Sequence, residues 1–417
     1  MAGWMGSQGI TPRNNTATQL PGNPATLRRM RSRVVLIAAI LAAAAVTSPA
    51  QTPQGRQSDG ALANRPGADR QPEFPIPNIR EYRPHSTLVA PQHPVARAKY
   101  PVIDIHSHQP TPISQDQLAT VVQSMDPLNL RLLVNASGAT GDRLVQSIAA
   151  IKNTPFKDRM VMFTNVDFRE AVGPGYGQKV AKQIEQDVKN GALGIGEIMK
   201  NFGLRARKAD GSRLTLDDPE LDAIWDTAAR LNVPVLIHTA DPQEFFQPIN
   251  YQNERWLELA LYPDRRYPSD RFPSFDQINT ERDRLFRKHP KTTFIMAHLG
   301  WHANDLGRLG KMFDEMPNVY GEVGAVLYDL GRQPRAAHDF MVKYQDRILF
   351  GKDSYQPDEF PYYWRVFETA DEYFDYYRDY HAFWKLYGLA LPDPVLRKLY
   401  YANALKLVPG LPKTGLP

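Results

Sequence analysis

From Tyr100 onward, short apolar runs rich in β-branched residues alternate with longer stretches in which apolar residues recur every three or four positions. The first pattern predicts buried strands, and the second predicts amphipathic helices. Strands that alternate with helices indicate βαβ units and a parallel sheet. The runs predict eight strands: Val102–His106, Leu132–Asn135, Met160–Val166, Leu193–Ile198, Val233–His238, Thr293–His298, Val319–Val323 and Ile348–Gly351.

Helical periodicity falls between these strands and after the last of them. The long segment Pro242–Ser274 follows the fifth strand, and insertions of this length usually form a wall or lid of an active site. The pattern predicts a (β/α)₈ TIM barrel with this insertion after strand 5 and with C-terminal helices packed on the barrel. The predicted helices are Gln178–Lys189, Asp218–Leu231, Phe275–Lys288, Asp305–Met316, Arg335–Tyr344, Tyr362–Tyr387 and Pro394–Leu407.

The N-terminal region carries the pattern of a secretory signal peptide. Arginines at positions 28, 29, 31 and 33 precede the apolar run Val34–Val46, and the small residues Thr47–Ala50 follow it. The run is shorter than the roughly 20 residues of a membrane-spanning helix. We expect translation to start at Met30 and the protein to be exported to the periplasm or secreted, without stable membrane insertion after cleavage. An uncleaved N-terminal anchor is the alternative.

The chain then divides into three predicted parts. Residues 1–50 are a leader, and residues 51–97 form a Pro-rich linker because frequent prolines there deny it a regular helix or central strand. Residues 98–417 form the barrel domain. With 417 residues in total, the chain is long enough for one such barrel, which typically takes about 250 residues.

Charge and cysteine content narrow the chemistry. The net charge of +5 comes from the first fifty residues, which hold five arginines and no acidic residue, so the rest is formally neutral. A protein that binds nucleic acid needs a basic face, so we expect no nucleic-acid partner for this chain. Because the chain has no cysteine, a metal would have to be held by imidazole and carboxylate groups.

Polar residues gather where the predicted strands end, and in a barrel those ends meet at one face. His106 and His108 are two positions apart on the first strand, so their side chains point to the same side and could bind one cation. His238 and His298 each end an apolar strand, where a histidine needs a partner. Taken singly, each of these two histidines is as readily a hydrogen-bonded core residue as a metal ligand. Taken together with His106 and His108, they are predicted to be metal ligands.

Acidic residues occupy equivalent positions. Asp353 follows the eighth strand and could ligate a divalent metal and take a proton from its water, although an N-capping role is the alternative. Glu197 closes the predicted fourth strand. Three roles stay open for it: a ligand that bridges a second metal, a hydrogen-bond partner of a metal ligand, or an ion-pair partner of Lys200. Glu322 and Asp167 are interpreted as salt-bridge residues.

Five segments in this order resemble the amidohydrolase superfamily, and more narrowly its amidohydrolase-related, ACMSD-like branch. They are Asp104–His108, Val235–Thr239, Phe294–Gly300, Ile348–Asp353 and Tyr400–Leu407. The resemblance implies that His106, His108, His238 and Asp353 ligate a metal, commonly zinc, and that His298 binds a second metal or the attacking water. One ion is favoured and two remain open, because Glu197 is similar to a metal-ligating glutamate of the TatD-type hydrolases. Lys352 departs from the small residue or threonine usual before the aspartate.

The expected enzyme is a hydrolase that uses a metal-activated water on an amide, lactone or ester bond of a small molecule, with Asp353 and His298 as catalytic residues. The alternative is non-oxidative decarboxylation of a small unsaturated or aromatic acid, and a remote one is a non-catalytic binding protein. Candidate substrate ligands are Arg255 in the insertion, Lys352 and His302, with Arg205 and Arg207 as further cations. The sequence does not determine whether the protein is a monomer or an oligomer.

We predict that the exported protein begins near Gln51, because cleavage after Ala50 would remove the apolar run. N-terminal sequencing of material from the periplasm or medium measures this directly. Protein that stays in the membrane and starts upstream of Val34 would contradict the prediction and support the uncleaved anchor.

Overall fold

The computed structural model describes residues 73–75, 78–378, 380 and 384–417. The predicted signal peptide and the first part of the predicted linker lie outside these residues, so both stay predictions. Among the described residues, the structure contains no helix that is long and apolar enough to cross a membrane. The described chain from Glu73 onward belongs to one compact unit.

All eight predicted strands are present, and every pairing between them is parallel. The first three form one sheet and the last five form a second, each in sequence order. Most strand positions are buried. The strands are β1 Val102–Ser107, β2 Leu130–Asn135, β3 Met160–Met162, β4 Ile195–Ile198, β5 Val235–Ile237, β6 Phe294–Met296, β7 Val319–Glu322 and β8 Ile348–Leu349.

Backbone hydrogen bonds join the two sheets at both seams. The Thr164 amide donates to the Gly194 carbonyl at 2.9 Å, which links the chain after β3 to β4. The Ile105 amide donates to the Phe350 carbonyl at 3.1 Å, and the Asp353 amide donates to the His106 carbonyl at 2.7 Å, which link β1 to the end of β8. The strands therefore follow one another in the order of a (β/α)₈ barrel, as the sequence predicts.

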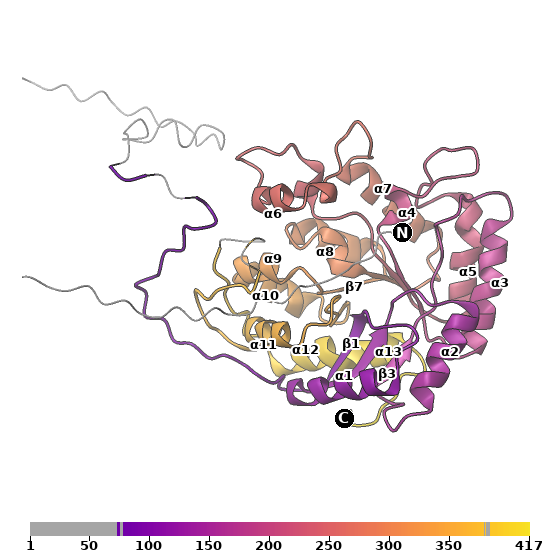
Figure 1. Cartoon of the computed structure of the whole chain (residues 1–417), viewed down its shortest axis with the longest axis horizontal. Coiled ribbons are helices and arrows are strands. Elements are labelled where there is room, and N and C mark those ends of the chain that lie inside the picture. The colour runs from indigo at the N-terminus through magenta and orange to yellow at the C-terminus, as the bar shows by residue number, and fades with distance from the viewer. Residues whose placement is uncertain (1–72, 76–77, 379, 381–383) are drawn as a thin grey trace, which may run out of the picture. The chain divides into compact units, whose positions relative to one another are not determined.

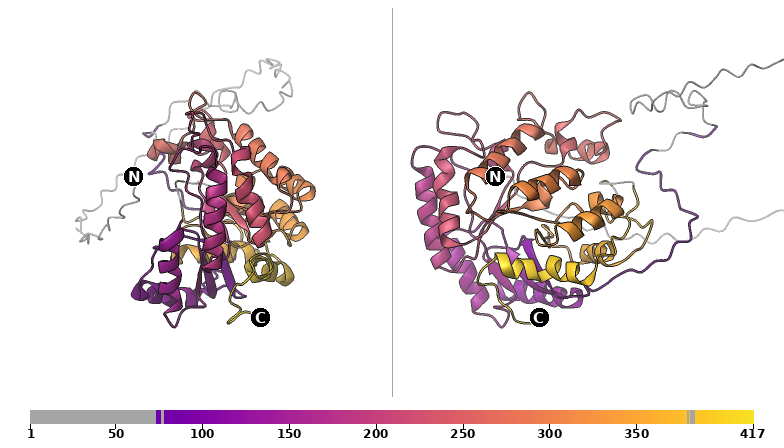
Figure 2. Two further views of the ribbon diagram at one scale, coloured as in Figure 1. Left: turned by 90° about the vertical axis from the view of Figure 1, so that its right-hand side faces the viewer. Right: turned by 180° about the vertical axis from the view of Figure 1, so that it is seen from behind.

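Helices cover the outside of the strands (Figures 1 and 2). The last helical segment, Asp393–Leu407, contacts β1 and β8. The α-helices are α1 Gln115–Leu128, α2 Gly141–Lys152, α3 Tyr176–Lys189, α4 Asn201–Leu204, α5 Asp222–Leu231, α6 Trp256–Leu261, α7 Phe275–Lys288, α8 Leu306–Glu315, α9 Leu327–Arg332, α10 Pro334–Lys343, α11 Phe360–Glu368, α12 Asp393–Arg397 and α13 Asn403–Leu407.

Five predicted helices agree with α3, α5, α7, α8 and α10, and Pro394–Leu407 agrees with α12 and α13 joined by a π-helical turn. The helix predicted over Tyr362–Tyr387 is wrong beyond Glu368. At Thr369 the backbone becomes extended, and the Thr369 hydroxyl donates to the Arg365 carbonyl at 2.8 Å, which ends α11. Phe374 and Leu386 then pair in an antiparallel bridge.

The long helices α1 and α2 and the short helices α4, α6 and α9 were not predicted. The signal for α1 was present, because Ser114 and Gln117 form a capping box that satisfies the first backbone amides of the helix. Pro110 and Pro112 precede this start and Pro127 lies in the last turn, so the segment has the composition of a loop. The insertion after β5 carries α6 and two 3₁₀ turns.

Gly196 determines how β4 presents the residue after it. Its φ of +124° is unfavourable for residues with a side chain, and an added Cβ would lie 2.2 Å from the Leu236 carbonyl oxygen on β5. Glycine at this position therefore allows β4 and β5 to approach each other and fixes the place of Glu197.

We predict that Gly196→Ala destabilises the fold by about 1–3 kcal/mol, the usual cost of overpacking combined with strain at positive φ. Thermal unfolding followed by circular dichroism should show a lower melting temperature. Gly211→Ala is the matched control, because Gly211 has a φ of +85° but no atom within 4 Å of an added Cβ. Equal melting temperatures for the two variants would refute the role of close packing.

Candidate metal centre

The C-terminal end of β1 carries two histidines whose rings meet edge to face. His106 is fully buried, while the side chain of His108, directly after the strand, is 29% exposed. Their Nε2 atoms lie 3.3 Å apart. Alternation along the strand places both rings on the same side, as predicted from their spacing.

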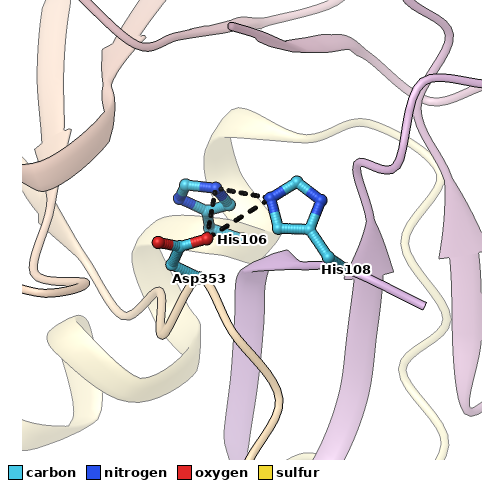
Figure 3. A group of neighbouring side chains, drawn as sticks. All are labelled: His106, His108 and Asp353. Atoms are coloured by element: carbon cyan, nitrogen blue, oxygen red, sulfur yellow. Dashed lines mark hydrogen bonds and ion pairs between the residues drawn. The ribbon is translucent and has the colours of Figure 1, made fainter. Parts of the chain in front are cut away.

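Asp353 approaches this pair from the loop after β8 (Figure 3). Its Oδ1 lies 3.4 Å from His108 Nε2 and 3.8 Å from His106 Nε2. Figure 3 shows the carboxylate and the two imidazoles pointing toward one another. The backbone of Asp353 has a φ of +75°, and its amide is bonded to the His106 carbonyl at 2.7 Å, so the β1–β8 seam sets the carboxylate in place.

Glu197 reaches the same point from β4. It is 2% exposed, and its Oε2 lies 3.1 Å from His108 Nε2 and 3.4 Å from His106 Nε2. We call His106, His108, Glu197 and Asp353 the four-residue cluster. Its members come from strands β1, β4 and β8, which are far apart in the sequence.

The donor set of the four-residue cluster fits a divalent cation. Zinc binds nitrogen and oxygen ligands at about 2.0–2.2 Å, which places neighbouring ligand atoms of a tetrahedral site about 3.3–3.6 Å apart. The five separations given above, 3.1 to 3.8 Å, cover that range. Two imidazoles and two carboxylates also suit manganese or iron.

The pKa shifts within the cluster indicate that positive charge stabilises it. Burial raises the pKa of Glu197, but the neighbouring charge of His106 outweighs it and holds the pKa well below its usual range. Burial lowers the pKa of His106, but Glu197 outweighs it and raises the pKa well above the usual range. In the absence of a cation, the carboxylates thus keep a proton on the imidazole.

His238 lies next to the cluster and contacts it through Glu197. Its Nδ1 is 2.6 Å from Glu197 Oε1, and its Nε2 lies 3.3 Å from the Trp301 indole nitrogen. Asp241 Oδ1 lies 3.6 Å from Nε2 on the other side of the ring. Burial lowers the pKa of His238, but Asp241 and Glu197 raise it to about 9. Whether His238 ligates the metal stays a prediction.

His298 is held in a strained turn at the end of β6. It has a φ of +58°, a conformation that is rare outside glycine and frequent at functional sites. Its Nδ1 lies 2.9 Å from the Gly324 carbonyl, which can only accept, so Nδ1 carries the proton and the lone pair is on Nε2. Burial and the charge of His238 lower the pKa of His298, which favours this neutral form.

Glu322 forms the ion pair expected of it, with the ring of His106, and its further hydrogen bonds tie β7 to the turn after β6. Glu322 is fully buried at the end of β7, and its Oε1 accepts from His106 Nδ1 at 3.1 Å and from the His298 amide at 2.6 Å. Its Oε2 accepts from the Gly324 amide at 2.5 Å. Because Nδ1 of His106 is engaged, Nε2 faces the cluster. A signal was present, since Glu322 ends β7 and Glu197 is the last residue but one of β4.

The three candidate substrate ligands each contact another protein group. Arg255 is 3% exposed, with Nε 3.0 Å from Glu258 Oε2. The Lys352 ammonium pairs with Glu359, and His302 Nε2 lies 3.2 Å from Arg282 Nη2. Their roles in substrate binding stay predictions. Asp167, by contrast, forms the expected salt bridge, with Arg169 at 2.5 Å.

The sequence matches the family model of the amidohydrolases (Amidohydro_2) over residues 147–410, well over half of the chain. Glu197, His238, His298 and Asp353 lie within the matched region, and the histidine pair of β1 precedes it. The match therefore covers β3 to β8 and the C-terminal helices.

Solved structures with a similar course of the chain include an uncharacterised TIM-barrel protein from Bordetella bronchiseptica, with 14% identity, coverage of 73% of this chain and 97% of that one, and a TM-score of 0.46. Another is 2,6-dihydroxybenzoate decarboxylase from Rhizobium, with 14% identity, 74% and 98% coverage, and a TM-score of 0.45. A third is a dihydroxybenzoic acid decarboxylase from Polaromonas with bound manganese, with 14% identity, 74% and 96% coverage, and a TM-score of 0.44.

We predict that Glu322→Gln weakens divalent-metal affinity by about 10–100-fold, the usual cost of losing the partner of a ligating histidine. All three groups that contact the Glu322 oxygens are N–H donors, so no orientation of an amide can satisfy them. Calorimetric titration with zinc and manganese measures the affinity. Glu281→Gln is the control, because Glu281 is equally buried but pairs with Arg213. Unchanged affinity in Glu322→Gln would refute the assignment.

Proposed function

Because the chain belongs to the amidohydrolase family, we propose that it is a metal-dependent hydrolase that cleaves an amide, ester or lactone bond of a small molecule. The observation that carries the proposal is the convergence of the four-residue cluster at the C-terminal ends of the strands, with the neutral ring of His298 beside it. In a (β/α)₈ barrel this is the face where catalytic residues gather.

A divalent cation held by the cluster would lower the pKa of water to about 7 and polarise a substrate carbonyl. Within the cluster, the Asp353 carboxylate is 36% exposed and the His108 ring 29% exposed, while His106 and Glu197 are closed off. Substrate therefore approaches from the side of Asp353 and His108. Asp353 is the carboxylate placed to accept the proton of an attacking water and to pass it to the leaving group.

His298 serves the same proton transfer from the other side. Its Nδ1–H is bonded to the Gly324 carbonyl, so the free lone pair of Nε2 can accept a hydrogen bond and orient a water molecule. The ring centre lies 5.3 Å from that of His106. Because Glu322 holds the His298 amide, the ring keeps its position relative to the cluster.

Non-oxidative decarboxylation of a small unsaturated or aromatic acid is the alternative. It is the activity named for two of the solved structures above. The same cluster could bind a substrate carboxylate, and Asp353 or His298 would then supply a proton to the carbon that loses carbon dioxide. The assay below distinguishes the two reactions.

We propose one divalent ion, with zinc as the first to test and manganese as the second, and a small-molecule substrate. Export is proposed separately, from the arginines before the apolar run Val34–Val46. An exported hydrolase with this cluster would act on small molecules outside the cytoplasm.

We predict that Asp353→Asn lowers kcat by 10² or more, the usual scale for loss of a general base, while part of the metal is retained. His298→Asn should slow turnover and leave the metal in place. The measurements are rates on panels of amides, esters, lactones and aromatic acids, carbon dioxide release, and metal content by mass spectrometry.

His289→Asn is the matched control, because His289 is a buried histidine that pairs with Asp222 and Asp226 instead of the cluster. It should keep the wild-type rate. A wild-type rate in Asp353→Asn would contradict the proposed proton transfer, and release of carbon dioxide without hydrolysis would replace the hydrolase with the decarboxylase.

A further inference from the structure

The turn that carries His298 has a left-handed backbone throughout. The φ values are +58°, +51°, +61° and +56° for His298, Leu299, Gly300 and Trp301. Such a run is costly for residues with a side chain, because the Cβ atom crowds the following carbonyl oxygen, and only Gly300 avoids this cost. The surrounding structure must therefore hold the turn in this conformation.

Arg282 contacts this turn from α7. Its side chain is fully buried, and its Nη1 donates to the Gly300 carbonyl at 3.2 Å. Its Nη2 lies 3.2 Å from Nε2 of His302, the residue that directly follows the turn. The guanidinium packs closely against the backbone, since a Cβ added to Gly300 would lie 2.7 Å from Arg282 Nη1. One side chain thus binds the turn at two points.

Asp283 fixes the direction of the guanidinium. Its Oδ1 accepts from Arg282 Nε at 3.1 Å and from Nη2 at 2.9 Å. A buried guanidinium without an anionic partner is costly, and Asp283 supplies that partner from the same helix. Because Nε and Nη2 are held from α7, Nη1 is directed at the turn.

His302 accepts the second contact of Arg282. A guanidinium can only donate, so His302 Nε2 accepts and the ring is neutral. Burial, and after it the charge of Arg282, lower the pKa of His302 well below its usual range, which favours the same neutral form. Nε2 of His302 is therefore engaged in supporting the turn, whereas the sequence suggested His302 as a substrate ligand.

The turn determines where the His298 ring points. At one end of the turn, the His298 amide donates to Glu322 at 2.6 Å, and Nδ1 donates to the Gly324 carbonyl at 2.9 Å. At the other end, the bond from Arg282 holds the Gly300 carbonyl. The ring centre of Trp301, the last left-handed residue, lies 4.5 Å from that of His298. A change in the turn would therefore displace both rings.

Arg213 makes the same kinds of contact at a different place. It pairs with Glu281, also on α7, and donates to the Gly203 carbonyl at 2.8 Å, where the φ is +81°. The turn at Gly203 carries no histidine. Both arginines thus support a left-handed glycine, but Arg282 supports one beside the proposed proton-transfer residue.

We propose that Arg282 is a positioning residue for the proton transfer assigned to His298, because it stabilises the left-handed turn that directs the His298 ring. This inference rests on the proposed function, in which His298 orients a water molecule. It adds a residue of α7, outside the strand ends, to the groups on which the reaction depends.

The test is a double-mutant cycle on the zinc-loaded, full-length protein, with the substrate that the panel of amides, esters, lactones and aromatic acids yields. Arg282→Lys keeps the charge beside Asp283 but loses the planar fork that reaches Asp283 and the Gly300 carbonyl together. We expect kcat to fall by roughly 10–10²-fold, the scale of a small misplacement of a catalytic group, with KM and metal content close to wild type.

In the His298→Asn background, Arg282→Lys should change kcat little further, because Arg282 acts through His298. Arg213→Lys is the matched control and should keep the wild-type kcat. If Arg282→Lys fails to fold, Asp283→Asn replaces it, since this variant keeps the guanidinium but weakens the contact that directs it. It should lower kcat in the same way.

Nuclear magnetic resonance gives a readout that does not depend on activity. In protein with ¹⁵N-labelled histidine, the His298 Nδ1–H bonded to the Gly324 carbonyl should give a signal that disappears in His298→Asn. This signal should shift or broaden in Arg282→Lys and stay unchanged in Arg213→Lys.

A wild-type kcat or an unchanged His298 signal in Arg282→Lys would overturn the inference and leave the proposed function intact. An equal loss of kcat in the wild-type and His298→Asn backgrounds would also overturn it, because Arg282 would then act independently of His298. A wild-type protein that binds no divalent ion, or turns over nothing in the panel, would instead refute the proposed function. The His298 signal would then still decide whether Arg282 holds the ring.

Discussion

Charge balance among four side chains is the constraint on which the catalytic end of the barrel depends. His106, His108, Glu197 and Asp353 converge from three strands, with ligand atoms 3.1 to 3.8 Å apart. Two carboxylates this close to two imidazoles, largely withdrawn from water, need positive charge between them. Protons on the imidazoles can supply it, and a divalent cation supplies it while leaving the imidazoles neutral.

The surrounding structure keeps these groups converged. Glu322 contacts the ring of His106 and the backbone amide of His298 with the same oxygen, so β1 and the turn after β6 are tied together at this point. Asp104 Oδ1 accepts from the His106 and Lys352 amides, both at 3.0 Å, and so ties β1 to the loop that carries Asp353. Arg282, fully buried, donates to the Gly300 carbonyl within the left-handed turn that follows β6.

Local pattern was enough to predict the strands and the longer helices α3, α5, α7, α8 and α10 between them, because apolar runs and their spacing depend on neighbouring residues in the chain. It failed where local signals conflicted. Prolines around α1 obscured a capping box, and aromatic periodicity after Glu368 continued past the point where Thr369 ends α11. There the chain turns back to pair Phe374 with Leu386, a contact that periodicity does not encode.

The sequence by itself determined the fold class, the alternation of strands and helices, and which polar residues end the strands. The same positions predicted that His106, His108 and Asp353 would meet, since strand ends in a parallel barrel share one face. Only the tertiary structure decided which of the remaining polar side chains contact His106, His108 and Asp353. Glu197, His238 and Glu322 come from β4, the residue after β5, and β7, and which of them faces the cluster depends on hydrogen bonds between strands. Those bonds are set by side-chain orientation in three dimensions, which the order of residues along the chain does not specify.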